Sequence, residues 1–175
     1  MSGFPAAYGF VLQQEKGDYA GDEARDPNPT RDGVTQRRYN RWRTDRGLKP
    51  RSVFEMDEAE RTAVYHEEWE VSKADYLPGR AATALYDHAI NAGPMRAVQV
   101  LQRVVGVKDD GVFGPQTLAA VRHFVGAHGE DALFQSLQWE RLRYYLAITD
   151  ANRRLRPNLA SWLRRVLALT EGGPR

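Results

Sequence analysis

Acidic side chains gather in one short stretch near the start of this chain. From Leu12 to Gln36 the sequence reads LQQEKGDYAGDEARDPNPTRDGVTQ, and its first acidic residue, Glu15, follows the apolar run FVL. Glycines and prolines interrupt the acidic residues that come after it, so this stretch is predicted to be a loop rather than a helix. Such a loop is often a solvated surface. A glutamate at the end of an apolar segment, followed by several aspartates, is also a residue set that can cleave a glycosidic bond.

This chemistry places two demands on the residues. A carboxylic acid must protonate the leaving oxygen, and a second carboxylate usually steers water or stabilises the positive charge of the transition state. The acid must hold its proton near neutral pH, which burial beside apolar groups favours. Glu15 fits the acid because Val11 and Leu12 lie in the helical turn before it. The second carboxylate is expected in the loop that follows.

Helices are predicted to position these residues. In the first segment Phe4, Tyr8, Val11 and Leu12 recur at helical spacing. The predicted helices cover residues 4–15, 35–46, 57–74, 81–92, 94–105, 116–127, 131–148 and 151–169, and the third begins with a capping box formed by Asp57 and Glu60. No segment alternates with a period of two. The sequence therefore predicts an all-α fold, a compact multi-helix bundle with at most a small β-hairpin near residues 18–35.

Composition excludes several classes of protein and site. The chain has no cysteine, which excludes disulfides and thiolate metal sites. We expect neither a metal nor a cofactor, because no two histidines have the spacing of zinc ligands beside an acid. The apolar runs are shorter than the roughly 20 residues of a membrane span. The opening MSGFPAAYGFVLQQE has no basic leader, so no signal peptide is expected.

Basic and aromatic residues raise two further questions. The sequence pI of about 9.0 suits an anionic polymer such as nucleic acid or a bacterial cell wall. The segment RRYNRWRTDR, residues 37–46, raises the alternative of nucleic-acid binding, but Asp45 and the acidic loop favour a solvated helix face. The aromatic residues of the C-terminal half are expected to pack in the core rather than on sugars: Trp139, Tyr144, Tyr145 and Trp162.

Four motifs follow one another along the chain. The first is EKGDY at 15–19, followed by Asp22, Thr30 and GVT at 33–35; the second is Trp69 with ADYLP at 74–78. The third is DHAINAG at 87–93, with RA at 96–97 and LQ at 101–102. The fourth is DGVFGPQTL at 110–118, with ER at 140–141 and SWLRR at 161–165. In this order they resemble the glycoside hydrolase family 108 lysozymes, N-acetylmuramidases with a predicted peptidoglycan-binding C-terminal region, over about residues 8–166.

The resemblance implies a fold, a substrate and a mechanism. It implies a lysozyme-like fold with a catalytic region at 1–92 and a peptidoglycan-binding-like region at 93–175, which we expect to pack as one continuous body. The expected enzyme cleaves the β-1,4 bond between N-acetylmuramic acid and N-acetylglucosamine. Departures from the family pattern, EKGDY for EGGY and Asn28-Pro29 for a Gly-Gly, leave the alternative of a catalytically inactive peptidoglycan-binding or virion module.

The same resemblance assigns roles to individual residues. Glu15 is the expected general acid, Asp22 the second carboxylate with Asp26 as the alternative, and Thr30 the residue that holds the attacking water. Tyr19, Asn91 and Asp87 are candidates for substrate binding, although each has a structural alternative. Without a signal peptide, the protein is expected to be made in the host cytoplasm and to reach the cell wall through a holin, as a phage endolysin does, or on a phage particle.

Overall fold

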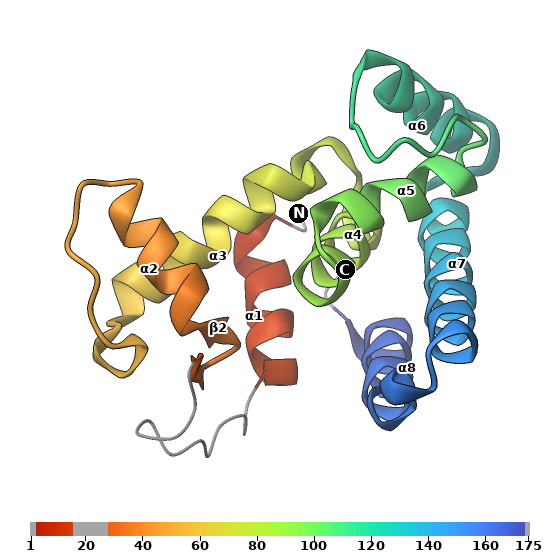
Figure 1. Cartoon of the computed structure of the whole chain (residues 1–175). Coiled ribbons are helices and arrows are strands. Elements are labelled where there is room, and N and C mark those ends of the chain that lie inside the picture. Colours follow the sequence, from red (N-terminus) through yellow and green to blue (C-terminus); the bar gives the residue numbers. More distant parts are fainter. Residues whose placement is uncertain (1–2, 16–27, 174–175) are drawn as a thin grey trace. The chain divides into compact units, whose positions relative to one another are not determined.

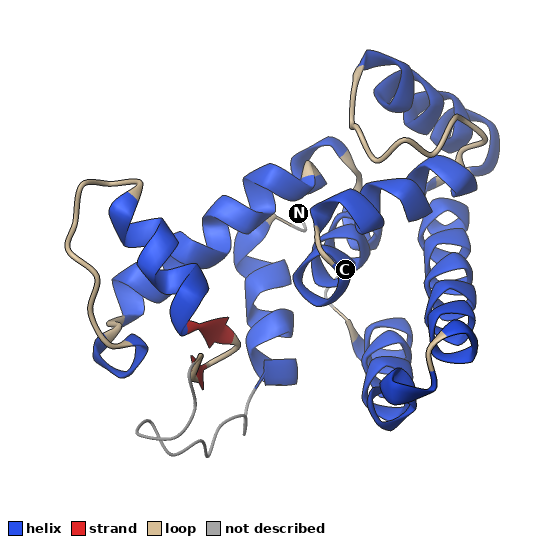
Figure 2. Cartoon of the chain, in the orientation of Figure 1, coloured by secondary structure: helices blue, strands red, loops and turns tan. Residues whose placement is uncertain are grey.

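The computed structural model describes residues 3–15 and 28–173. The described residues are mainly helical, and a single hairpin of two short strands is the only sheet among them (Figures 1 and 2). The prediction of an all-α bundle with a small hairpin is therefore confirmed. The chain forms two compact units, Val11–Glu67 (the small unit) and Met1–Phe10 with Glu68–Arg175 (the large unit). The boundaries between them fall within helices α1 and α3.

The small unit is built around the hairpin. It contains the end of α1 (Phe4–Glu15), β1 (Thr30–Arg31), β2 (Val34–Thr35), α2 (Gln36–Thr44), the 3-10 helix η1 (Val53–Glu55) and most of α3 (Glu58–Ser72). The strands pair antiparallel, with Arg31 opposite Val34. Asp32 and Gly33 form the two-residue turn between them and both have positive φ, 48° and 75°. Asp-Gly is favoured in this type of hairpin turn because its geometry requires positive φ at both positions.

Local sequence signals fix where the helices of this unit begin. The hydroxyl of Thr35 caps α2 by accepting a hydrogen bond of 3.3 Å from the backbone N–H of Arg38. The predicted capping box is confirmed before α3, because Asp57 Oδ1 accepts from the N–H of Glu60 at 2.8 Å and Glu60 Oε2 accepts from the N–H of Asp57 at 3.3 Å. These caps satisfy backbone donors that a helix leaves unpaired at its start.

The large unit packs its helices around α4 and α7. Its remaining elements are η2 (Ala74–Tyr76), α4 (Gly79–Ala92), α5 (Pro94–Val104), α6 (Pro115–His128), α7 (Glu130–Ala151), η3 (Arg153–Leu155) and α8 (Arg156–Gly172). Helix α4 packs against α5 and α7, and α7 also packs against α6 and α8 (Figure 1). The small residues Ala81, Ala82 and Ala84 are buried on α4, so that neighbouring helices can approach closely.

Two expectations for this unit were wrong in detail. The last helix begins at Arg156 rather than near 151, because Asn152 ends α7 and its side chain caps η3 through a 3.1 Å hydrogen bond from the N–H of Arg154. Trp139 is not in the core, since its side chain is 68% exposed. Its neighbours Leu137 and Arg141 lie on the buried face of α7, and helical periodicity turns position 139 outward. Tyr145 is buried as expected.

No helix among the described residues combines the length and apolar character needed to cross a membrane.

Candidate active site

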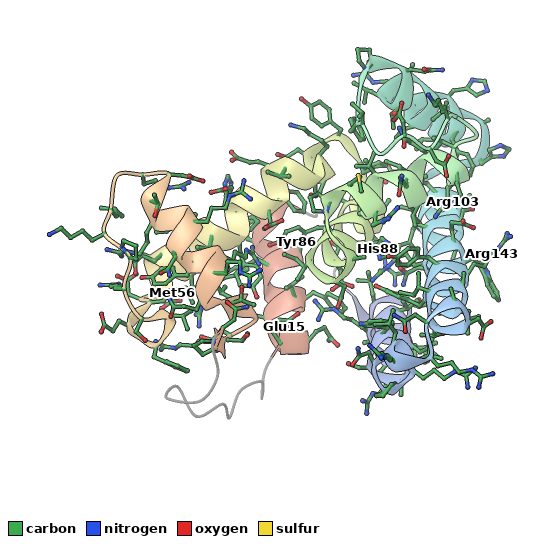
Figure 3. The ribbon with its side chains drawn as sticks, viewed as in Figure 1. Glu15, Met56, Tyr86, His88, Arg103 and Arg143 are labelled. Carbon is green, nitrogen blue, oxygen red and sulfur yellow. The ribbon has the colours of Figure 1, made fainter. Side chains whose placement is uncertain are left out.

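Glu15 lies at the C-terminal end of α1 (Figure 3). It is half-buried, and its carboxyl lies close to Gly33 in the hairpin turn. A Cβ atom added to Gly33 would lie 2.9 Å from both Cγ and Oε2 of Glu15, and it would overlap the hydroxyl of Tyr65. These distances are shorter than any ordinary van der Waals contact. The position therefore strongly favours glycine, both for its positive φ and for the space that the Glu15 carboxyl occupies.

Helix α3 holds the hairpin turn from the other side. The hydroxyl of Tyr65 donates a 2.7 Å hydrogen bond to the backbone oxygen of Asp32, and Arg61 pairs with the carboxylate of Asp32 at 2.8 Å. The guanidinium of Arg38 lies over the Tyr65 ring, 5.2 Å from its centroid. The turn that contacts Glu15 is thus fixed by α2 and α3 together. The role of Tyr65 could not be predicted from the sequence, because nothing in the local pattern of α3 distinguishes it from a core aromatic residue.

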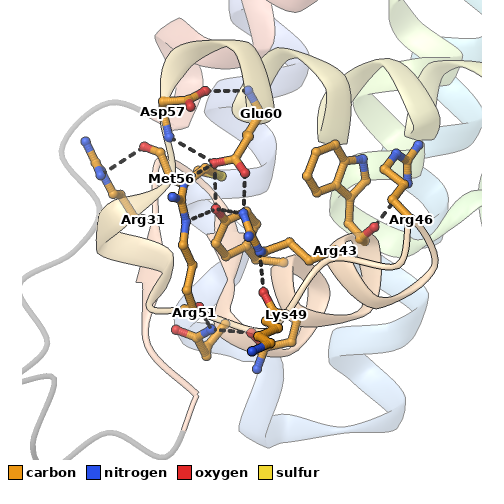
Figure 4. A network of polar contacts seen from close by, with 12 residues as sticks. Arg31, Arg43, Arg46, Lys49, Arg51, Met56, Asp57 and Glu60 are labelled. Carbon is orange, nitrogen blue, oxygen red and sulfur yellow. Dashed lines mark hydrogen bonds and ion pairs between the residues drawn. The ribbon is translucent and has the colours of Figure 1, made fainter.

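A second set of polar contacts joins α2, the segment after it and the start of α3 (Figure 4). Glu60 accepts a 2.6 Å hydrogen bond from the Tyr39 hydroxyl and pairs with both Arg43 and Arg51. Burial alone would raise the pKa of Glu60, but hydrogen bonds from Tyr39 and the Asp57 backbone, together with the charge of Arg51, lower it below its ordinary value. Glu60 is therefore an ionised scaffold residue rather than a proton donor.

This network also anchors the hairpin and engages part of the basic segment. Arg31 donates to the backbone oxygens of Phe54 and Met56, the latter at 3.1 Å, which ties β1 to η1 (Figure 4). Just after α2, Arg46 pairs with Glu67 at 3.0 Å. Within the basic segment, Arg43 thus holds the fold through Glu60, whereas Arg37, Arg41 and Arg46 are exposed.

The predicted site residues fall into three groups. Glu15 and Thr30 both lie in the small unit, and Thr30 is half-buried in β1 opposite Thr35. Tyr19, Asp22 and Asp26 lie outside the described residues.

Asp87 and Asn91 lie on α4 in the large unit. Asp87 is fully buried, and its carboxylate accepts from Arg141 at 2.5 Å and from Arg165 at 2.7 Å. Asn91 is half-buried and donates a 3.3 Å hydrogen bond to the backbone oxygen of Asp87. The two ion pairs account for the structural role that the sequence left open for Asp87.

Within residues 3–15 and 28–173, no group of three histidine, aspartate or glutamate side chains could hold a metal ion.

Comparison with known proteins identifies relatives of both halves of the chain. A family model described as Glycosyl hydrolase 108 matches residues 8–93, and one described as Predicted Peptidoglycan domain matches residues 96–167. The structure of Brucella abortus SagA matches with a TM-score of 0.68 and 30% sequence identity, over 96% of this chain and 95% of the SagA chain. A search of curated proteins finds no match. The likeness to SagA thus extends over nearly the whole length of both chains.

Proposed function

Because the chain belongs to the glycosyl hydrolase 108 family and is a glycoside hydrolase of peptidoglycan, we propose that it is an N-acetylmuramidase with Glu15 as its general acid. The bond cleaved is the β-1,4 linkage between N-acetylmuramic acid and N-acetylglucosamine. One observation supports the choice of Glu15 above all others. Its carboxyl packs on Gly33 at a turn that α2 and α3 hold rigidly, and catalysis requires such a fixed position.

The proposed reaction breaks the bond from the anomeric carbon to the glycosidic oxygen and forms a bond from that carbon to a water oxygen. One proton passes from Glu15 to the leaving oxygen. A second passes from the water to a carboxylate, which is the second carboxylate if the reaction inverts and the ionised Glu15 if it retains. Glu15 donates its proton to the glycosidic oxygen, which leaves with N-acetylglucosamine. Thr30 holds the water that attacks the anomeric carbon of N-acetylmuramic acid, and the second carboxylate, Asp22 or alternatively Asp26, assists at that carbon. Carboxyl groups about 6.5–9.5 Å apart would give inversion, and about 5–5.5 Å would give retention. The anomer of the first product, read by NMR, decides between them.

Substrate contacts complete the proposal. Tyr19 and Asn91 are proposed to bind sugar, and Asn91 is only half-buried. For Asp87, which is buried against two arginines, we propose that it acts by holding α4 in place rather than by contacting the sugar. Replacement of Asn91 by Ala should raise KM with little change in kcat, because such a contact binds ground state and transition state alike.

The decisive test compares wild type with Glu15→Gln on purified peptidoglycan. Reducing ends are counted, and the products are identified by mass spectrometry. We expect muramic acid at the new reducing ends, and a loss of about 10²–10⁴-fold in rate for the variant. Glu58→Gln is the matched control, since it makes the same chemical change at an exposed position of the same unit.

Other outcomes would redirect the proposal. Glucosamine at the new reducing ends would mean that the other glycosidic bond is cleaved. Equal rates for wild type and Glu15→Gln would remove Glu15 from the mechanism. No release from any wall type by the folded protein would favour the inactive binding or virion module.

Delivery to the wall stays a prediction. A phage endolysin that leaves the cytoplasm through a holin, or a lysozyme on a phage particle, would suit a peptidoglycan hydrolase. Expression with and without a holin tests the first route, since lysis should require the holin.

A further inference from the structure

The large unit contains an open groove beside the loop that joins α5 to α6. The groove has a volume of about 330 Å³, and its lining is mostly apolar: Lys73, Tyr76, Phe113, Gly114, Pro115 and Leu118. We propose that it binds the glycan strand of peptidoglycan, with a sugar ring stacked on the aromatic pair Tyr76 and Phe113. The proposal takes its substrate from the proposed function, but it does not depend on the role of Glu15.

The aromatic pair is the first observation. The rings of Tyr76 and Phe113 have centroids 5.5 Å apart and planes tilted by 35°. Tyr76 is 52% exposed, and Phe113 is half-buried. Large apolar side chains that gather at an open hollow mark a binding surface more often than single exposed ones do. A sugar ring has apolar C–H faces that pack on aromatic rings, while the tyrosine hydroxyl can bond a sugar hydroxyl.

The loop that carries Phe113 is held in one conformation, which is the second observation. Gln102 is 2% exposed, and its amide nitrogen lies 2.9 Å from Asp110 Oδ1, 3.1 Å from the Val112 oxygen and 3.1 Å from Thr117 Oγ1. Its amide oxygen accepts from the N–H of Gly111 at 2.8 Å. One buried side chain therefore fixes both ends of the turn that presents Val112 and Phe113. A surface held in this way loses little entropy when a ligand binds.

Charge and family context select the occupant. Lys73, at the groove edge, brings a positive charge toward a polymer whose lactyl and peptide groups carry carboxylates. Residues 113–118 lie inside the region matched by the model described as Predicted Peptidoglycan domain. The neutral aromatic floor suits the sugar rings, and the single cation suits an adjacent carboxylate. A stem peptide alone would use the cation but leave the aromatic floor without a matching ring.

The test uses the full chain carrying Glu15→Gln, so that the ligand is not hydrolysed. A β-1,4-linked tetramer of N-acetylglucosamine, which has neither carboxylate nor peptide, is titrated while backbone amide signals are followed by NMR. We expect the signals of residues 111–118 to shift, and Tyr76→Ala to weaken the affinity read from them about tenfold. Tyr76 is exposed, so this variant should fold. Trp139→Ala is the matched control, because it removes a 68% exposed aromatic residue outside the groove.

Three results would overturn the proposal. The first is that the signals of residues 111–118 do not shift with the tetramer. The second is that Trp139→Ala weakens their response as much as Tyr76→Ala does. The third is that free stem peptide shifts these signals when the tetramer does not. Wall hydrolysis by the wild-type protein is measured in parallel. Hydrolysis without loop shifts rejects the groove alone, whereas loop shifts without hydrolysis reject the muramidase proposal alone.

Discussion

Replacement of Gly33 by Ala tests the contact on which the assignment of Glu15 depends. The substitution has two separate effects. Gly33 has a φ of 75°, and a residue with a Cβ atom pays about 1–2 kcal/mol in this left-handed region. The new methyl group would also lie 2.9 Å from Cγ and Oε2 of Glu15 and overlap the Tyr65 hydroxyl, so the Glu15 carboxyl must move.

A second glycine separates the two effects. Gly47 also has a positive φ, 70°, but a Cβ added there has nothing within 4 Å. Gly47→Ala therefore carries the same backbone cost without touching the site. We expect Gly47→Ala to lose about 1–2 kcal/mol in unfolding free energy, measured with urea. Gly33→Ala should lose more, because its methyl group must also displace the buried Tyr65 hydroxyl. A displacement of the carboxyl by about 1 Å should reduce the rate about 100-fold, and this loss should be confined to Gly33→Ala.

The assay is reducing-end release from peptidoglycan at saturating substrate, on protein shown to be folded. Wild-type activity in Gly33→Ala would contradict the assignment of Glu15 as the acid, because the carboxyl would then tolerate displacement from its proposed catalytic position. An equal activity loss in Gly47→Ala would refute it as well, since destabilisation alone would explain the result.

Three further predictions concern stability. Asp87→Ala leaves two arginines buried without their anion and should lower the unfolding free energy by about 3–5 kcal/mol; a urea midpoint close to wild type would contradict this. Burial, and then the charges of Arg141 and Arg103, hold the pKa of His88 well below its ordinary value. As pH falls below about 6.5, His88 therefore takes up a proton in the unfolded chain but not in the folded protein. Stability should then decline by at most about 1.4 kcal/mol per pH unit from this group, and urea titrations of His88→Gln should show a shallower decline. Burial opposes the shift, but hydrogen bonding lowers the pKa of Glu60 in the folded protein. The stability that ionised Glu60 contributes is therefore complete above about pH 4.3 and is lost as pH falls through the lower folded pKa. Glu60→Gln should be less stable than wild type at pH 7, and its unfolding free energy should change less than that of wild type when the pH is lowered.

Much of the helical framework could be predicted because its signals are local. The capping box of Asp57 and Glu60 spans a single turn, and Pro94 and Pro115 each lie in the first turn of a helix. A proline there loses no hydrogen bond that the helix needs. The small residues of α4 are likewise a local signal, since they are typical of a helix that packs closely against its neighbours.

Contacts between distant residues could not be predicted in the same way. Asp87 is separated in sequence from its partners Arg141 and Arg165 by 54 and 78 positions, and each arginine looks like a surface residue in its own segment. The exposed Trp139 shows the converse error. Its residue type favours the core, but the orientation of α7 is set by the neighbours that pack on it.

The tripeptide Asp-Gly-Val, which occurs at 32–34 and again at 110–112, shows where local prediction ends. Both glycines adopt positive φ, so the sequence correctly indicates a turn at each site. At each, the missing Cβ also makes room for a distant group: Glu15 lies against Gly33, and the backbone oxygen of Met95 would be 3.1 Å from a Cβ on Gly111. The turn is a property of the tripeptide, whereas the group that fills the space is a property of the fold. One copy therefore supports a candidate acid and the other a candidate sugar groove, a difference that no inspection of the tripeptide alone would reveal.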